Sequence, residues 1–201
     1  MKIWIVSILL MLIIYPNVLT QGLDENTFNI SSKRAKSIIS QKAKEVIVAI
    51  KNKDIEKLST FVHPTKGLCF IQYSCLSDSN LILNQKQIKI LLQSKQRYIW
   101  GKDDGSLKPI KLTFQQYYKT FLYDLDYLNA PVINYNKVLL GGGANYCFED
   151  YQKQISVQFF FPKHPDPNYN KIDTWGALRL IFSEKDGIWY LTKIIHDTWT
   201  I

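Results

Sequence analysis

The chain has few of the residues around which common catalytic and metal sites are built. Among 201 residues there are only three cysteines and three histidines. No two cysteines have the C-x2-C spacing of a zinc module. The glycines at 141–143 lack the Lys-Ser/Thr and the helix of a phosphate-binding loop, and no serine lies in a G-x-S-x-G nucleophile elbow. The stretch "KDDGS" lacks the spacing of a calcium loop. These absences predict no metal and no cofactor.

Arginine is also scarce, although the chain is basic. Lysine and arginine together exceed aspartate and glutamate by eight, and removal of Lys2 would leave an excess of seven. The lysines are scattered along the chain without a run of five. Arginine, whose planar guanidinium binds phosphate better than a lysine ammonium does, occurs only at positions 34, 97 and 179 (Arg34, Arg97 and Arg179). This distribution indicates solvated surfaces and no nucleic-acid partner.

The three cysteines are Cys69, Cys75 and Cys147. The first two belong to one strand-like run, and on a straight strand they would lie about 20 Å apart, too far for a disulfide. We therefore expect buried thiols. A bond from Cys147 to one of the other two is left open by the sequence.

The N-terminus has the pattern of a secretory signal peptide. Lys2 is followed by an apolar run from Ile3 to Tyr15 and by small residues before position 21. The run is too short for a membrane span of about 20 residues. We expect cleavage near Thr20–Gln21, an exported periplasmic or secreted chain with no remaining transmembrane span, a flexible lead-in at 21–32 and one domain at 33–201. An uncleaved anchor is the alternative.

Hydrophobic periodicity predicts helices in the first half of the domain. Apolar residues recur every three or four positions from a serine cap at 31 or 32 to about Asn52, while Gln41 and Lys44 fall outside this stripe. Asp54 opens a second helix that ends at His63-Pro64. Further helices are predicted at 84–93 and 114–125.

Strands dominate the rest. Runs at 67–75 and 132–140, a hairpin at 97–113, and three strands at 155–161, 177–184 and 187–199 are rich in aromatic and β-branched residues. Lys185-Asp186-Gly187 forms the turn between the last two strands. This segregation of helices and antiparallel strands predicts an α+β fold.

Three stretches together resemble a group of uncharacterised bacterial exported proteins and lipoproteins. These stretches are "AIKNKDIEKLSTFVHPTKGLCF", "YIWGKDDGSLKPIKLTFQQYYKTFLYDLDYLNAP" and "LRLIFSEKDGIWYLTKIIHDTWTI". The resemblance covers residues 33–201 and implies the cystatin-like cone, also called the nuclear-transport-factor-two-like fold. In that cone N-terminal helices pack on a curved antiparallel sheet and can enclose a deep pocket. The chain lacks the lipobox cysteine of the lipoproteins, so no lipid anchor is implied.

The C-terminal His196-Asp197 pair is not expected to act as a catalytic dyad. Neighbouring residues on a regular strand point to opposite faces, whereas a relay needs the two side chains within about 3 Å. His196 is therefore either a strand histidine with hydrogen bonds of its own or a pocket residue with a partner from elsewhere in the chain.

Three further side chains complete the candidate site. His63 either lines the pocket mouth or bonds the last carbonyls of the second helix. Asp124 is either a turn residue or is held by a cation such as Arg179. Arg179, in the middle of a predicted strand, must be paired or lie on an open face, and if it points inward it is the best anchor for an anion.

The fold supports several functions. We expect an exported protein that binds a small molecule or a protein partner in the cone without catalysis, using His63, Asp124, Arg179 and His196. One alternative is a general acid–base enzyme (a lyase, isomerase or hydrolase) that uses the same residues. The other is an interaction module that forms a homodimer through the outer face of its sheet.

Overall fold

The computed structural model describes residues 29–72, 81–103, 105–139, 154–165 and 173–198. The predicted signal peptide, most of the lead-in, Cys75 and Cys147 lie outside these ranges. Cys69 is buried. No helix in the described ranges is long and apolar enough to cross a membrane.

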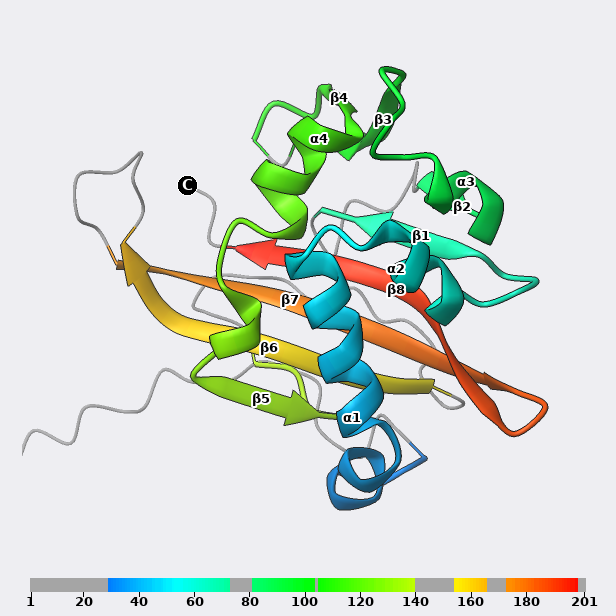
Figure 1. Cartoon of the computed structure of the whole chain (residues 1–201). Coiled ribbons are helices and arrows are strands. Elements are labelled where there is room, and N and C mark those ends of the chain that lie inside the picture. The colour runs from blue at the N-terminus through cyan, green and yellow to red at the C-terminus, as the bar shows by residue number, and fades with distance from the viewer. Residues whose placement is uncertain (1–28, 73–80, 104, 140–153, 166–172, 199–201) are drawn as a thin grey trace, which may run out of the picture.

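The apolar stripe of the first helix packs on the sheet. Helix α1 (Ser32–Lys51) begins after Ser31, whose hydroxyl accepts a hydrogen bond from the Arg34 backbone amide. Its buried face is formed by Ala35, Ile39, Ala43, Val46, Ile47, Ala49 and Ile50. Helix α2 (Ile55–Phe61) follows after the cap Asp54. In Figure 1, α1 lies diagonally across the long strands.

The main sheet of the described residues has six strands, ordered β2-β1-β8-β7-β6-β5. They are β1 (Leu68–Ile71), β2 (Leu81–Leu83), β5 (Val132–Tyr135), β6 (Gln154–Pro165), β7 (Asp173–Lys185) and β8 (Ile188–Thr198). Neighbouring strands are antiparallel except β1 and β8, which run parallel. The sheet is thus mainly antiparallel, as predicted, with the parallel β1/β8 pair as the exception among the described residues. The three-residue strand β2 was not predicted.

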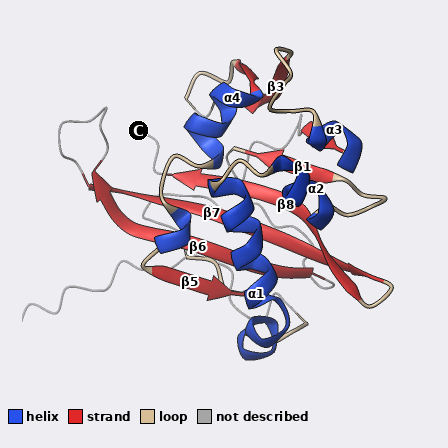
Figure 2. Ribbon diagram, viewed as in Figure 1, coloured by secondary structure: helices blue, strands red, loops and turns tan. Residues whose placement is uncertain are grey.

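Smaller elements lie beside β1 at one edge of the sheet (Figure 2). They are α3 (Gln85–Lys89), the hairpin β3 (Arg97–Lys102) and β4 (Pro109–Thr113), α4 (Phe114–Tyr117) and the π-helix η3 (Tyr118–Leu122) that continues α4. The 3-10 helix η4 (Tyr127–Asn129) instead contacts α1 and β6. The predicted single helix at 114–125 is therefore a short α-helix that widens into a π-turn. Residues 162–165 and 173–176, predicted as loop, extend β6 and β7.

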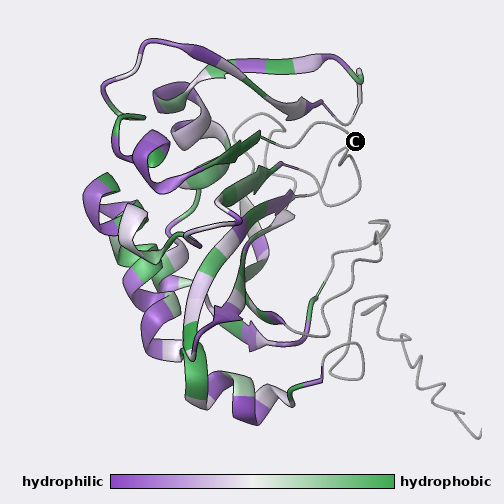
Figure 3. Cartoon of the chain, turned by 90° about the vertical axis from the view of Figure 1, so that its right-hand side faces the viewer, coloured by the Kyte–Doolittle hydropathy of each residue, from purple (hydrophilic) through white to green (hydrophobic). Residues whose placement is uncertain are grey.

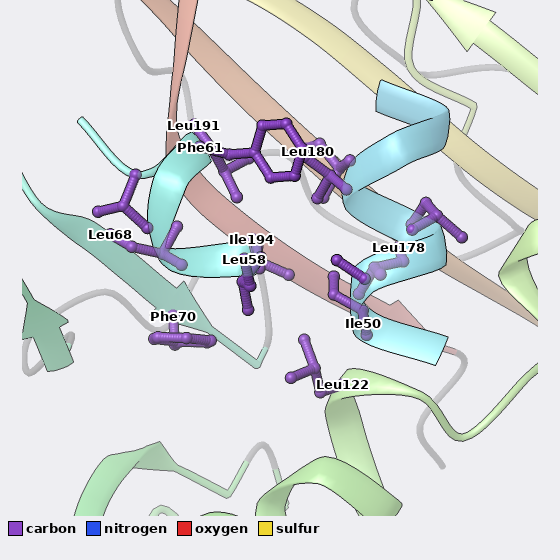
Figure 4. Close-up of a cluster of buried hydrophobic side chains, with 14 of the residues drawn as sticks. Ile50, Leu58, Phe61, Leu68, Phe70, Leu122, Leu178, Leu180, Leu191 and Ile194 are labelled. Atoms are coloured by element: carbon purple, nitrogen blue, oxygen red, sulfur yellow. The ribbon is translucent and has the colours of Figure 1, made fainter. Parts of the chain in front are cut away.

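Apolar side chains fill the space between the helices and the sheet. In Figure 4, Ile50 of α1 and Leu58 of α2 lie around the same centre as Leu178, Ile194 and Leu122 from β7, β8 and η3. Figure 3 shows both helices on one side of the strands. The fold is therefore the predicted α+β arrangement, with N-terminal helices on a curved and mainly antiparallel sheet.

Candidate functional site

Two of the predicted site residues form a pair. The Nε2 atom of His196 on β8 lies 3.1 Å from Oδ2 of Asp124, which follows η3. The other carboxylate oxygen, Oδ1, accepts a hydrogen bond of 2.8 Å from the Tyr127 hydroxyl. The His196 side chain is only 3% exposed, whereas that of Asp124 is 26% exposed. The carboxylate thus covers a buried imidazole.

Burial and the neighbouring charge shift the pKa of each member of this pair in opposite directions. Burial lowers the pKa of His196, but the Asp124 carboxylate and its hydrogen bond, with Asp197 and the Gln72 backbone, raise it above 6.5 in total. Burial likewise raises the pKa of Asp124, and the His196 charge and the hydrogen bonds of His196 and Tyr127 bring it below 3.8. The geometry is that of an ion pair, with Asp124 held by His196 and not by Arg179.

Aromatic rings occupy the space around this pair. The Phe121 ring meets His196 edge-on with centroids 5.5 Å apart, and Tyr117 contacts Phe121 at the same centroid distance. Tyr117 in turn stacks on Trp100 at 3.9 Å with the planes inclined by 11°. These rings therefore cover one side of the imidazole, and the arrangement gives no support to general acid–base catalysis by His196.

The Arg179 side chain lies on the face of the sheet opposite to the one that carries His196. It is 1% exposed, and its Nη2 atom lies 2.5 Å from Oδ2 of Asp197. His196 and Asp197 thus have different partners on different faces, as strand alternation predicts. The outer face around this ion pair is buried at Ala177, Ile181 and Ile195, so Arg179 is not an anchor for an anion in the cone.

His63 is separate from the other three candidates. Its Nδ1 atom accepts hydrogen bonds from the backbone amides of Thr65 at 3.2 Å and Lys66 at 3.0 Å. Of the two alternatives that the sequence left open for His63, the bond to helix carbonyls differs from this geometry, because the Nδ1 atom is an acceptor. Burial, followed by the charges of Lys66 and Lys185, lowers the pKa of His63, which agrees with a neutral ring.

In the described part of the chain, packed side chains therefore surround these four residues, and the hollows that the described residues form lie elsewhere. Among the described residues no group of three or more His, Cys, Asp or Glu side chains is placed to hold a metal ion.

A groove lies instead at the edge of the cone, between α1 and β5. It has a volume of about 310 Å³. Apolar and aromatic side chains of η4, β5 and β6 line it: Leu128, Ile133, Tyr135 and Phe159. On the α1 side its lining consists of Ser40, Gln41 and Lys44. We call this hollow the α1/β5 groove.

Sequence reasoning did not select the groove residues. Gln41 and Lys44 were recognised only as positions outside the apolar stripe of α1, and Phe159 only as a core strand residue. The sequence feature that could have indicated the groove is a combination of two patterns. Two polar positions lie one turn apart on a helix, and aromatic residues lie on the strand that this helix faces. Pairing α1 with β5 requires the tertiary fold.

A second hollow flanks the other side of α1. It has a volume of about 220 Å³ and shares Gln41 and Lys44 with the α1/β5 groove. Its lining also includes Glu45, Asp54 and Lys57, so that two acidic side chains accompany two lysines. The α1/β5 groove has no acidic residue in its lining.

Comparison with known proteins adds only distant similarities. No protein-family model and no curated protein matches the chain. The structure of an NTF2-like protein from Cytophaga hutchinsonii is similar at 12% identity and a TM-score of 0.37, over 82% of this chain and 98% of that one. A calcium/calmodulin-dependent protein kinase II association domain from Xanthomonas campestris is similar at 12% identity and a TM-score of 0.30, over 80% and 85% of the two chains. Similarities this low transfer no residue, ligand or partner to this chain.

Proposed function

We propose that the protein is a non-catalytic binding protein that holds a small molecule in the α1/β5 groove. The observation that carries the proposal is the groove itself. Its volume of about 310 Å³ lies at the lower end of the roughly 300–1,000 Å³ of small-molecule sites. Four apolar or aromatic side chains and a few polar groups form its lining, the composition that such sites share.

The partners of the ionisable candidates argue for binding over catalysis. His196 and Arg179 are each paired with a carboxylate inside the protein, and His63 accepts two backbone hydrogen bonds. None of the three lines the groove. The alternative of a homodimer through the outer sheet face gains no support, because apolar residues of that face are already buried in the single chain.

The test is a screen of small apolar and amphipathic compounds by ligand-observed NMR, combined with a variant that fills the groove. Ser40→Phe places a ring in the groove, and Ser37→Phe makes the same change on an exposed position of α1 that does not line it. We expect binders to lose affinity for Ser40→Phe and to keep it for Ser37→Phe. Binding that survives Ser40→Phe, or no binding by any compound, contradicts the proposal.

We also propose that binding takes place after export. The proposal is supported by the signal-peptide pattern at residues 1–20, which lies outside the described residues. Mass spectrometry of the protein made in a bacterium with its own leader tests it. A mature chain that begins near Gln21 is expected, and a full-length chain that stays in the cytoplasm contradicts this part of the proposal.

A further inference from the structure

The lining of the α1/β5 groove contains a single charged group. Lys44 is that group, and its side chain has no ion-pair partner among the described residues. The other polar lining residues, Ser40, Gln41 and Tyr135, are neutral side chains. Because a carboxylate next to the ammonium would cancel its charge, the absence of an acidic lining residue matters as much as the lysine itself.

Two acidic side chains from the same part of the fold lie outside the lining of the groove and have partners of their own. Glu45 accepts a hydrogen bond of 2.9 Å from the Gln41 amide and lines the hollow on the other side of α1. Asp126, close in sequence to Leu128, forms an ion pair of 3.0 Å with Lys51. The excess charge at the groove is therefore positive.

The cation faces an apolar surface. Phe159 belongs to the concave core and is only 3% exposed, while Ile133 is 42% exposed at the edge strand. Burying Ile133 and its neighbours against a ligand would be favourable by about 25 cal/mol for each Å² of apolar surface removed from water. A guest that satisfies the whole lining must combine an apolar body with one negative charge.

Because the cation of the groove is a lysine and not an arginine, the groove favours one class of anionic ligand. A lysine ammonium is a compact point charge that matches one carboxylate group, whereas phosphate is read best by the planar fork of arginine. No arginine lines the groove. Its volume of about 310 Å³ restricts the body to a single ring or a short alkyl chain.

We infer that the α1/β5 groove selects small monocarboxylic acids with an aromatic or aliphatic body, and that Lys44 is the residue that recognises the carboxylate. This inference rests on the proposed function and names its ligand class. Lys44 acts as a partly solvated ion-pair partner, so its contribution decreases as salt increases.

The test compares hydrocinnamate with its neutral amide, which has the same body and no charge, by titration calorimetry near neutral pH. We expect the acid to bind roughly fivefold more tightly than the amide, the ratio that an ion pair of about 1 kcal/mol gives. Lys44→Gln should abolish this preference. Lys36→Gln, which removes an exposed lysine of the same helix that lines neither hollow, should preserve it.

The outcomes separate this inference from the proposed function. Equal binding of acid and amide that Ser40→Phe removes would overturn the selection of carboxylates and leave the groove as a binding site. A preference for the acid that persists in Lys44→Gln would overturn the role of Lys44. If neither compound bound, and no other compound of the screen did, both proposals would be overturned.

Discussion

His196 and Asp124 are 72 positions apart in the chain, and their Nε2 and Oδ2 atoms lie 3.1 Å apart. The contact ties the last strand of the sheet to the segment that follows the π-helix. Since the imidazole is buried and the carboxylate is partly exposed, we expect the pair to stabilise this junction.

The first prediction concerns this pair. We expect Asp124→Asn to lower the free energy of unfolding by about 1–3 kcal/mol near pH 6, because it removes the charge that holds the buried imidazolium. The pKa of His196, followed by NMR, should fall at the same time. Asp126→Asn is not an equivalent control, because Asp126 pairs with Lys51 of α1. Asp186→Asn is a better control, because Asp186 is 81% exposed and pairs with its chain neighbour Lys185 at the turn. An unchanged His196 pKa in Asp124→Asn would contradict the ion pair.

The pH dependence of the pair's contribution to stability follows from the pKa shifts of His196 and Asp124. The pKa of His196 is raised from 6.5, so its contribution is complete below pH 6.5 and is lost as the pH rises through the folded value. The pKa of Asp124 is lowered from 3.8, so its contribution is complete above pH 3.8 and is lost as the pH falls through the folded value. The stability difference between wild type and Asp124→Asn should therefore be largest between pH 3.8 and 6.5. Urea unfolding of both proteins across this range measures it.

The second prediction is that the pKa of His63 is shifted in the opposite direction to that of His196. Its pKa is lowered, so its contribution to stability is complete above pH 6.5 and decreases as the pH falls below that value. Protonation would also remove the acceptor of the Thr65 and Lys66 amides. In one NMR titration the His63 resonance should therefore move at a lower pH than the His196 resonance. The reverse order would contradict both assignments.

The third prediction concerns the buried ion pair on the outer face. Arg179→Met leaves the Asp197 carboxylate buried without this partner and should cost about 3–5 kcal/mol of unfolding free energy. The double variant Arg179→Met/Asp197→Leu should recover a large part of the loss, because neither charge of the pair is then left buried without the other. Arg97→Met, at an exposed arginine of β3, serves as the control in chemical denaturation. A double variant as unstable as the single one would argue against the pair.

The fourth prediction concerns the aromatic cluster that fills the cone. Trp100 is fully buried, stacks on Tyr117 and donates a 2.9 Å hydrogen bond from Nε1 to the Leu112 carbonyl. Trp100→Ala should cost about 3–5 kcal/mol. Ile99→Ala, at the adjacent position that is 50% exposed, should change stability by about 0.5 kcal/mol or less. Thermal unfolding compares the two variants, and similar losses would mean that the cluster is not a tight core.

The sequence predicted the elements better than their partners. The stripe of α1 specifies a helix because its burial has a regular period. Strands β6 and β7 are buried on both faces over most of their length, and their near-continuous apolar and aromatic runs specify them instead. Strand β2 is too short for such a pattern. The pairing of β1 with β8 is parallel and joins distant segments, which periodicity does not encode.

The partner of Arg179 shows where counting along the sequence fails. From the turn pair Lys185/Ile188, a regular hairpin would place Arg179 opposite Ile194. A bulge between Ile181 and Phe182 shifts the register by one residue, so that Arg179 lies opposite Ile195 and diagonal to Asp197. Because one residue of shift exchanges the faces of a strand, this bulge determines that Asp197, and not His196, pairs with Arg179.

The location of a bound acid tests the account most directly. In complexes with hydrocinnamate, intermolecular NOEs should connect the ligand ring to the methyl groups of Leu128 and Ile133 in the α1/β5 groove. NOEs from the ligand to the rings of Phe121 and His196 instead would mean that the cone opens to admit a guest, and would contradict a filled interior with binding at its edge.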